Sequence, residues 1–237
     1  LDMHNACLVK RFHLRDKKGR ETLIEGLRYV SRAHVHRMGV KLYVTPLNYD
    51  GMIEVENIID GSVINFCDAP RFKVKHTYLT ANRRLADKGA YLEVATRDND
   101  LHIGVGSYLE AVKNGENVIK TTQFGAFGEQ AVEFNDFDAV QGETVEVTKY
   151  VSIYTGRDVS TEEIPGAVAE EISAFRRQGF EEEFKEHQAV YDKLWQEADI
   201  QIGGDFELDR AVRFNIFHLM STGNEHDDRV NIGAKLL

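Results

Sequence analysis

Cysteine is scarce in this sequence. Only Cys7 and Cys67 occur among 237 residues, and no Cys or His pair has the spacing of a zinc ligand set. No Asn-x-Ser/Thr glycosylation signal occurs either. These absences favour a reducing, cytoplasmic compartment and a chain without a bound metal, although the two cysteines could still form a disulfide.

Long apolar runs and clusters of positive charge are also missing. No stretch approaches the roughly 20 apolar residues of a membrane-spanning helix. Lys and Arg number 29 against 39 Asp and Glu, and the basic residues are interleaved with acidic ones. The net charge of -10 therefore argues against nucleic acids and anionic membranes as partners. The chain opens on Leu1-Asp2-Met3 and shows no signal peptide. Because its first residue is not an initiator methionine, we expect its amino end to be cut or processed.

What is present is a succession of short runs in which apolar and polar residues alternate. From Cys7 to about Thr155 these runs recur between turn residues, which is typical of a sandwich or barrel. The sequence predicts about ten strands, at Cys7–Arg15, Glu21–Val30, Val40–Val44, Ile53–Ile59, Phe72–Leu79, Ala90–Thr96, Leu101–Ala111, Val118–Phe124, Ala131–Val140 and Thr144–Tyr154. Because no helical pattern separates them, the short connections require antiparallel sheets.

The apolar period becomes helical after Thr155. A first helix is predicted between the start signals at Ser160 and Pro165 and the stop at Gly179. A second helix places one apolar stripe along its length, made of Phe180, Phe184, His187, Tyr191 and Leu194 or Trp195. Each of these helices has one face to bury against the sandwich or against the other helix.

A third helix is predicted from the N-cap Asp205 to the terminating Gly223. It is apolar on nearly every face, through Ala211, Val212, Phe214, Ile216, Phe217, Leu219 and Met220. Such a helix must be covered by other helices, and the few residues that follow it are too short for that. We therefore expect the chain to be one piece of a longer polypeptide. When the rest is absent, we expect this helix to be exposed, poorly ordered or packed against a symmetry-related copy.

Two polar pairs are candidates for chemistry. His34 and His36 would share one face of a strand and could bind a metal, or they could be two surface histidines without a third ligand. Asp136 and Asp138 also share a strand face, where they could act as an acid-base pair or form a solvated outer face. In both cases the sequence favours the second interpretation.

Two further features have structural interpretations beside functional ones. Gly104-Val105-Gly106 begins like a dinucleotide fingerprint but lacks the third glycine, so close packing or a bulge is favoured. Trp195, the only tryptophan, could bind a sugar but lies on the stripe of a helix, which favours core packing. No serine, cysteine or threonine nucleophile and no phosphate loop is indicated.

Arg213 and His218 are unusual because they lie on the apolar third helix. An ionisable group buried there needs a partner, and Asp199 and Asp205 are candidates. A structural role is favoured over catalysis.

Several strings resemble one known family. Leu1–Asn5, Arg28–Ser31, Tyr43–Gly51, Asp60-Gly61 and the stretch from Trp195 to Leu219 are similar, in order, to motifs of the disaccharide phosphorylases of glycoside hydrolase family 65. That family includes maltose, trehalose and kojibiose phosphorylases. The resemblance implies a mainly β fold with a helical C-terminal part. It consists of an antiparallel β-sandwich of the galactose mutarotase-like supersandwich type, linker helices and the first helix of an (α/α)6 barrel.

The resemblance also implies domain bounds and an activity. Residues 1–157 would form the sandwich, which could lack N-terminal strands; residues 158–203 the linker; and residues 204–237 the start of a truncated catalytic barrel. The intact protein would be an inverting phosphorylase that cleaves an α-glucosidic disaccharide with inorganic phosphate to give β-glucose 1-phosphate and a sugar.

The resemblance leaves this chain without site residues. It predicts no catalytic, substrate-binding or metal-binding residue here, because the general acid and the phosphate site are expected beyond Leu237. It further implies no cofactor, a homodimer in the cytoplasm, and no activity of this piece alone. Two alternatives remain, namely a hydrolase of the same architecture and a non-catalytic carbohydrate-binding or scaffolding module.

Overall fold

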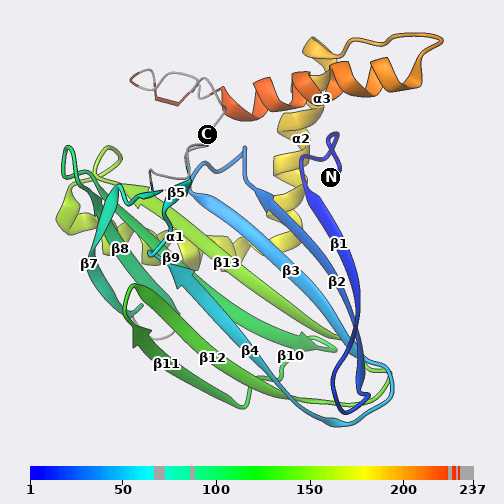
Figure 1. The fold of residues 1–237 in the computed structure, drawn as a ribbon, viewed down its shortest axis with the longest axis vertical. Helices are drawn as coiled ribbons and strands as arrows, with labels where there is room; N and C mark the ends of the chain where they lie inside the picture. The colour runs from blue at the N-terminus through cyan, green and yellow to red at the C-terminus, as the bar shows by residue number, and fades with distance from the viewer. Residues whose placement is uncertain (67–72, 86–88, 224–225, 228, 230–237) are drawn as a thin grey trace.

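The computed structural model describes residues 1–66, 73–85, 89–223, 226–227 and 229, and it contains a β-sandwich followed by three helices (Figure 1). The strands are β1 (Leu8–Arg15), β2 (Glu21–Val30), β3 (Arg37–Pro46), β4 (Gly51–Asp60), β5 (Asn65–Phe66), β6 (Lys73–Val74), β7 (Thr77–Arg84), β8 (Ala90–Thr96), β9 (His102–Lys113), β10 (Glu116–Asn117), β11 (Thr121–Phe127), β12 (Gln130–Ala139) and β13 (Val145–Thr155). A 3-10 turn (Thr161–Glu163) precedes α1 (Ile164–Gln178), α2 (Phe180–Ala198) and α3 (Phe206–Thr222).

Two antiparallel sheets form the sandwich. The larger has the strand order β1-β2-β3-β13-β9-β8-β7, with β10 paired to β9, and the smaller has the order β11-β12-β4. The short strands β5 and β6 pair with each other. The predicted fold class, mainly antiparallel β with a helical C-terminal part, is confirmed.

Most strand predictions lie within a few residues of the observed bounds. The exception is the strand predicted at Phe72–Leu79, since β7 runs from Thr77 to Arg84 and Phe72 lies outside the described residues. A register shift between Leu79 and Ala81 interrupts the simple alternation there, which explains the displaced prediction. A hairpin turn at residues 16–19 joins β1 to β2, and the Asp16 carboxylate accepts hydrogen bonds from the Lys18 and Arg20 backbone N–H groups.

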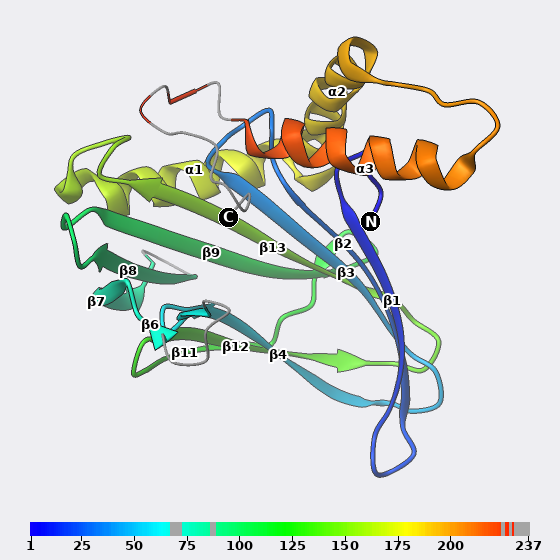
Figure 2. The same cartoon turned by 45° about the horizontal axis from the view of Figure 1, so that its top comes forward.

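The larger sheet is covered differently on its two faces. One face packs on the smaller sheet, where Leu109 and Val147 form a cluster with Phe137 of β12, while α1 lies on the opposite face (Figure 2). The buried residues of α1 are Ile164, Val168, Ile172 and Phe175. The helix therefore buries one face against the sandwich, as the sequence predicted.

Helix α2 connects the sandwich to the N-terminal segment. Its buried stripe includes Phe180, His187, Tyr191 and Trp195, as the sequence predicted. The Trp195 indole donates a hydrogen bond to the Met3 carbonyl (3.2 Å), and His187 Nε2 lies 3.1 Å from the Asn5 carbonyl oxygen. The N-terminus therefore lies beside α2 (Figure 1).

Helix α3 packs only lightly on α2. Asp205 accepts a hydrogen bond from the Leu208 backbone N–H (3.0 Å), and Gly223 follows the last turn, so both predicted helix ends are confirmed. Phe217 is its one buried residue, and it contacts the Tyr191 and Trp195 cluster. Several large apolar side chains are exposed, namely Phe206, Leu208, Phe214 and Leu219. Within the described part of the chain, no helix combines the length and apolar character needed to cross a bilayer.

Candidate functional site

His34 and His36 do not share a strand face, so that part of the prediction is wrong. Residues 31–36 form the loop between β2 and β3 and leave the alternating geometry of a strand. His36 stacks on Tyr154 with ring centroids 3.8 Å apart, and its Nδ1 atom lies 2.8 Å from the Ile153 carbonyl oxygen. His34 points instead to α2, so the two imidazoles have different partners.

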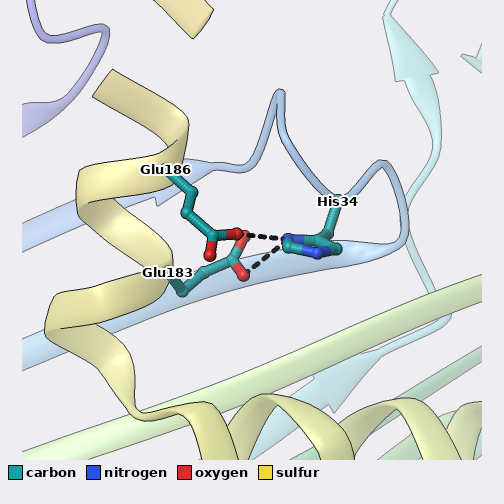
Figure 3. A group of neighbouring side chains, drawn as sticks. All are labelled: His34, Glu183 and Glu186. Carbon is teal, nitrogen blue, oxygen red and sulfur yellow. Dashed lines mark ion pairs between the residues drawn. The ribbon is translucent and has the colours of Figure 1, made fainter. Parts of the chain in front are cut away.

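His34 lies against two carboxylates of α2 (Figure 3). Its Nδ1 atom is 2.7 Å from Glu183 Oε2 and 3.6 Å from Glu186 Oε2. The two glutamates are three residues apart and therefore share a face of the helix. One ligand atom from each of the three residues lies within 4.8 Å of the others, so this group could hold a metal ion.

Glu183 is fully buried and fixed by neighbours on both oxygens. The Ser31 hydroxyl donates to Oε1 (2.5 Å), and Arg37 Nη1 donates to Oε2 (2.7 Å). Arg37 also donates from Nε to Glu171 (2.5 Å). Burial raises the pKa of Glu171, but hydrogen bonds from Arg37 and Tyr154 outweigh it and hold that pKa below its usual value. The cluster therefore ties the loop and β3 to both α1 and α2.

Asp136 and Asp138 belong to the outer face of β12, which confirms the favoured interpretation. Asp136 accepts from the Thr121 backbone N–H (2.8 Å), whereas Asp138 pairs with Lys120 (2.5 Å) and is exposed. The carboxylates thus have separate surface partners.

The sequence reasoning missed the opposite face of the same strand. Glu133 and Asn135 are each only 2% exposed and point into the sandwich with Phe137. Glu133 accepts from the Gly89 backbone N–H (2.7 Å) and from Asn57 Nδ2 (3.1 Å). Positions two apart in a strand share a face. The alternation along this strand could therefore have predicted that Glu133 and Asn135 point inward with the apolar Phe137.

Lys149 of β13 lies near this polar layer. Its amine donates to the Ile58 carbonyl oxygen (3.0 Å). Burial lowers the pKa of Lys149 to about 8, and the nearby Glu133 carboxylate only partly opposes that change. Glu133 and Lys149 each have a protein partner, which is typical of structural polar groups in a core, whereas Asn135 Nδ2 has no hydrogen-bond partner among the described residues.

Gly104 and Gly106 allow α1 to pack closely on the sheet, which confirms the interpretation that the sequence favoured. A Cβ atom on Gly106 would lie 2.4 Å from Val168 Cγ1 of α1, and one on Gly104 would lie 2.4 Å from Ile164 Cγ2. Trp195 packs in the core between α2 and α3 and is 7% exposed, which also confirms the structural interpretation.

Arg213 is not buried, contrary to the sequence-based expectation, because no neighbouring helix covers this part of α3. It donates from Nε and Nη2 to Asp199 (2.8 and 2.9 Å) and from Nη1 to Asp209 (3.1 Å). The Arg213 guanidinium holds the pKa of Asp199 below its ordinary value. Asp199 is thus confirmed as a partner, whereas Asp205 is not among the Arg213 contacts and instead caps α3.

His218 is half-buried and packs against two rings of its own helix. Its ring centroid lies 4.3 Å from that of Phe214 and 5.4 Å from that of Phe217. A cavity of about 1320 Å³ lies nearby, between the N-terminal segment, α2 and α3, and Asp199 and Arg213 form part of its wall. The disulfide that the sequence left open between Cys7 and Cys67 cannot be placed, since Cys67 lies outside the described residues; Cys7 is buried with a free thiol.

Comparisons with known proteins cover nearly the whole chain. Residues 1–194 match the family model for the glycosyl hydrolase family 65 N-terminal domain. The chain is 43% identical to a kojibiose phosphorylase of Thermoanaerobacter brockii and 44% identical to one of Caldanaerobacter subterraneus subsp. tengcongensis. These alignments cover 100% and 99% of this chain but only 31% of each relative, so the chain spans about a third of their length.

A solved structure shows the same fold. A candidate kojibiose phosphorylase from the human microbiome superposes with a TM-score of 0.82 over 99% of this chain and 29% of that chain. The sequence identity of 12% limits this likeness to the fold.

Proposed function

We propose that this chain, which belongs to glycosyl hydrolase family 65, is the amino-terminal part of an inverting glycoside phosphorylase. The intact enzyme would cleave an α-glucosidic disaccharide with inorganic phosphate and release β-glucose 1-phosphate and a sugar. The observation that carries this proposal is the match of 43% and 44% identity, over essentially the whole chain, to two kojibiose phosphorylases.

In the proposed enzyme, residues 1–157 are the sandwich, 158–203 the linker and 204–237 the beginning of an (α/α)6 catalytic barrel. The exposed apolar residues of α3 support this division, since Phe206, Phe214 and Leu219 would be covered by the helices that follow. The adjoining cavity beside Arg213 would be filled in the same way. The general acid and the phosphate site are proposed beyond Leu237, and phosphate is a co-substrate without a further cofactor.

The reaction needs one acid from the protein. That acid donates a proton to the glycosidic oxygen while a phosphate oxygen attacks the anomeric carbon from the opposite face, which inverts its configuration. Phosphate thereby replaces the base-activated water of an inverting glycosidase, so that a single carboxyl group suffices. In this proposal the sandwich and α2 position α3. Helix α2 is anchored to the sandwich through Phe180, and α3 is anchored to α2 through Phe217.

The test is a product analysis of the full-length protein. It is incubated with kojibiose first, then with trehalose, maltose and nigerose, each with and without phosphate. We expect glucose 1-phosphate of the β configuration, formed only when phosphate is present. Equal turnover without phosphate, with free glucose as the product, would instead identify a hydrolase and overturn the proposal.

Residues 1–237 alone provide a second comparison. We expect no turnover of any of these disaccharides by this piece, and no saturable binding of oligosaccharides to it. Saturable binding without the rest of the polypeptide would favour a carbohydrate-binding module. The proposed homodimer is checked by the mass of the full-length protein in solution.

A further inference from the structure

We propose that His34, Glu183 and Glu186 bind one divalent cation of the zinc class, which cross-links the sandwich to α2. The inference is independent of the proposed phosphorylase activity and concerns a structural site. The ligands come from the β2–β3 loop and from one face of α2 (Figure 3).

The distances suit a metal of this size. Zinc binds imidazole nitrogen and carboxylate oxygen at about 2.0–2.2 Å, so neighbouring ligand atoms lie roughly 3 to 3.5 Å apart. The two separations from His34 Nδ1 are 2.7 Å to Glu183 Oε2 and 3.6 Å to Glu186 Oε2. Glu186 is 46% exposed and can shift toward the ion by a small side-chain rotation.

The Nδ1 atom of His34 is buried, yet it makes no hydrogen bond within the described residues. It lies close to Glu183 Oε2, but that approach lacks hydrogen-bond geometry. A buried nitrogen beside two carboxylate oxygens is a ligand donor that remains to be satisfied.

Glu183 also retains lone pairs for a cation. The Arg37 guanidinium contacts the carboxylates of Glu171 and Glu183, and Glu186 lies beside Glu183 on the same helix. Among the described residues, Glu183 Oε1 accepts a hydrogen bond from Ser31 and Oε2 accepts one from Arg37. A carboxylate oxygen has two lone pairs, so each retains one for a metal.

The surroundings hold the ligands in place. Ser31 Oγ donates to Glu183 and accepts from the His34 backbone N–H (2.9 Å), so one hydroxyl orients both. His34 is 37% exposed, so water can complete a tetrahedral site from the solvent side. The imidazole nitrogen selects zinc-like ions over Mg²⁺ and Ca²⁺, which prefer oxygen ligands.

The experiment compares Glu186→Gln with Glu182→Gln in the full-length protein. Both glutamates are exposed residues of α2, but Glu182 pairs with Lys185 and lies outside the cluster. After treatment with EDTA, Zn²⁺ binding is measured by titration calorimetry, and bound metal by elemental analysis after dialysis. We expect one Zn²⁺ per chain in the wild type and in Glu182→Gln. In Glu186→Gln we expect affinity for this ion to fall by at least about 10-fold.

Two further readouts separate a metal ligand from an ion pair. Zn²⁺ should raise the melting temperature of the wild type, and His34→Gln should abolish that increase. Substitution with Co²⁺ should give a visible absorption band that Glu186→Gln loses. Equal Zn²⁺ binding by all the variants, or none by the wild type, would overturn the proposal and leave His34 as a neighbour of the two glutamates without a metal.

Discussion

Helices α1 and α3 are both rich in apolar residues, yet they differ in how much of that surface they bury. Ile164, Val168 and Phe175 of α1 are completely buried, whereas Phe206 and Leu219 of α3 are 73% and 58% exposed. The difference lies in the partner surface. Burial of apolar area stabilises a helix only where another surface is available to receive it.

The surface beneath α1 is shaped for it. Gly104 and Gly106 of β9 remove the side chains that would hold the helix away, and the ring of Phe175 packs edge to face on Tyr150. Among the described residues, α3 shares a smaller apolar cluster with the end of α2 and with Met3 and Ala6 of the N-terminal segment.

The largest expected effect compares how much α1 and α3 contribute to the stability of the fold. Phe175→Ala should destabilise the fold by about 3–5 kcal/mol, because it opens a cavity beneath α1. In residues 1–237 alone, Phe214→Ala, at a residue 46% exposed on α3, should change stability by less than about 0.5 kcal/mol. Urea denaturation of both variants measures the difference, and similar losses would show that α3 is packed as firmly as α1.

A second experiment changes the surface beneath α1. Gly106→Ala should cost about 1–3 kcal/mol, because the new Cβ atom overlaps Val168. Gly166→Ala is the matched control, since this exposed helical glycine has no atom within 4 Å of an added Cβ. It should instead stabilise α1 by about 0.5–1 kcal/mol. The same denaturation assay applies, and a neutral Gly106→Ala would argue against close approach of α1.

A third change tests the N-terminal end of α3. Asp205→Ala removes the acceptor for the Leu208 backbone N–H and should cost α3 about 1 kcal/mol, leaving α1 unaffected. Asp205→Asn keeps a capping oxygen and should behave like the wild type. Hydrogen exchange at the first turn of α3 is the measurement. Unchanged exchange in Asp205→Ala would show that other contacts hold this end.

The smallest expected effect is a loss of stability of α3 at low pH. The pKa of Asp199 is below its ordinary value of 3.8, so its carboxylate stabilises the fold above pH 3.8 and loses that contribution as the pH falls through the lowered folded value. The pair with Arg213 is exposed, so the gain is small. Below pH 3.8, proteolysis at α3 should increase in the wild type until it matches Asp199→Asn, while α1 stays protected. A constant difference between the two proteins at all pH values would contradict this role.

Local patterns predicted much of the fold. The positions of Asp205, Gly179 and Gly223 correctly bounded helices, because capping depends on residues a few positions apart. The alternation along β12 likewise placed Asp136 and Asp138 outside. Its inner face was available from the same pattern but was overlooked at Glu133.

The candidate metal site could not be predicted in this way. His34 lies in a loop, and its partners Glu183 and Glu186 are far away in the sequence, so no local spacing connects them. Similarly, the exposure of Arg213 depends on which helices surround α3, and the pattern of that helix alone implied burial. Only the tertiary arrangement determines such contacts.

The attachment of the N-terminal segment to α2 has a consequence for the order of folding. The contacts of Asn5 with His187 and Gln188 join residues 182 and 183 positions apart, and that of Met3 with Trp195 spans 192. Contacts of such high sequence separation form late, because a long loop must first be closed. During synthesis the segment from Leu1 to Cys7 must therefore remain without its native partners until α2 has left the ribosome. Over that interval the thiol of Cys7, which is buried in the folded chain, is accessible to oxidants.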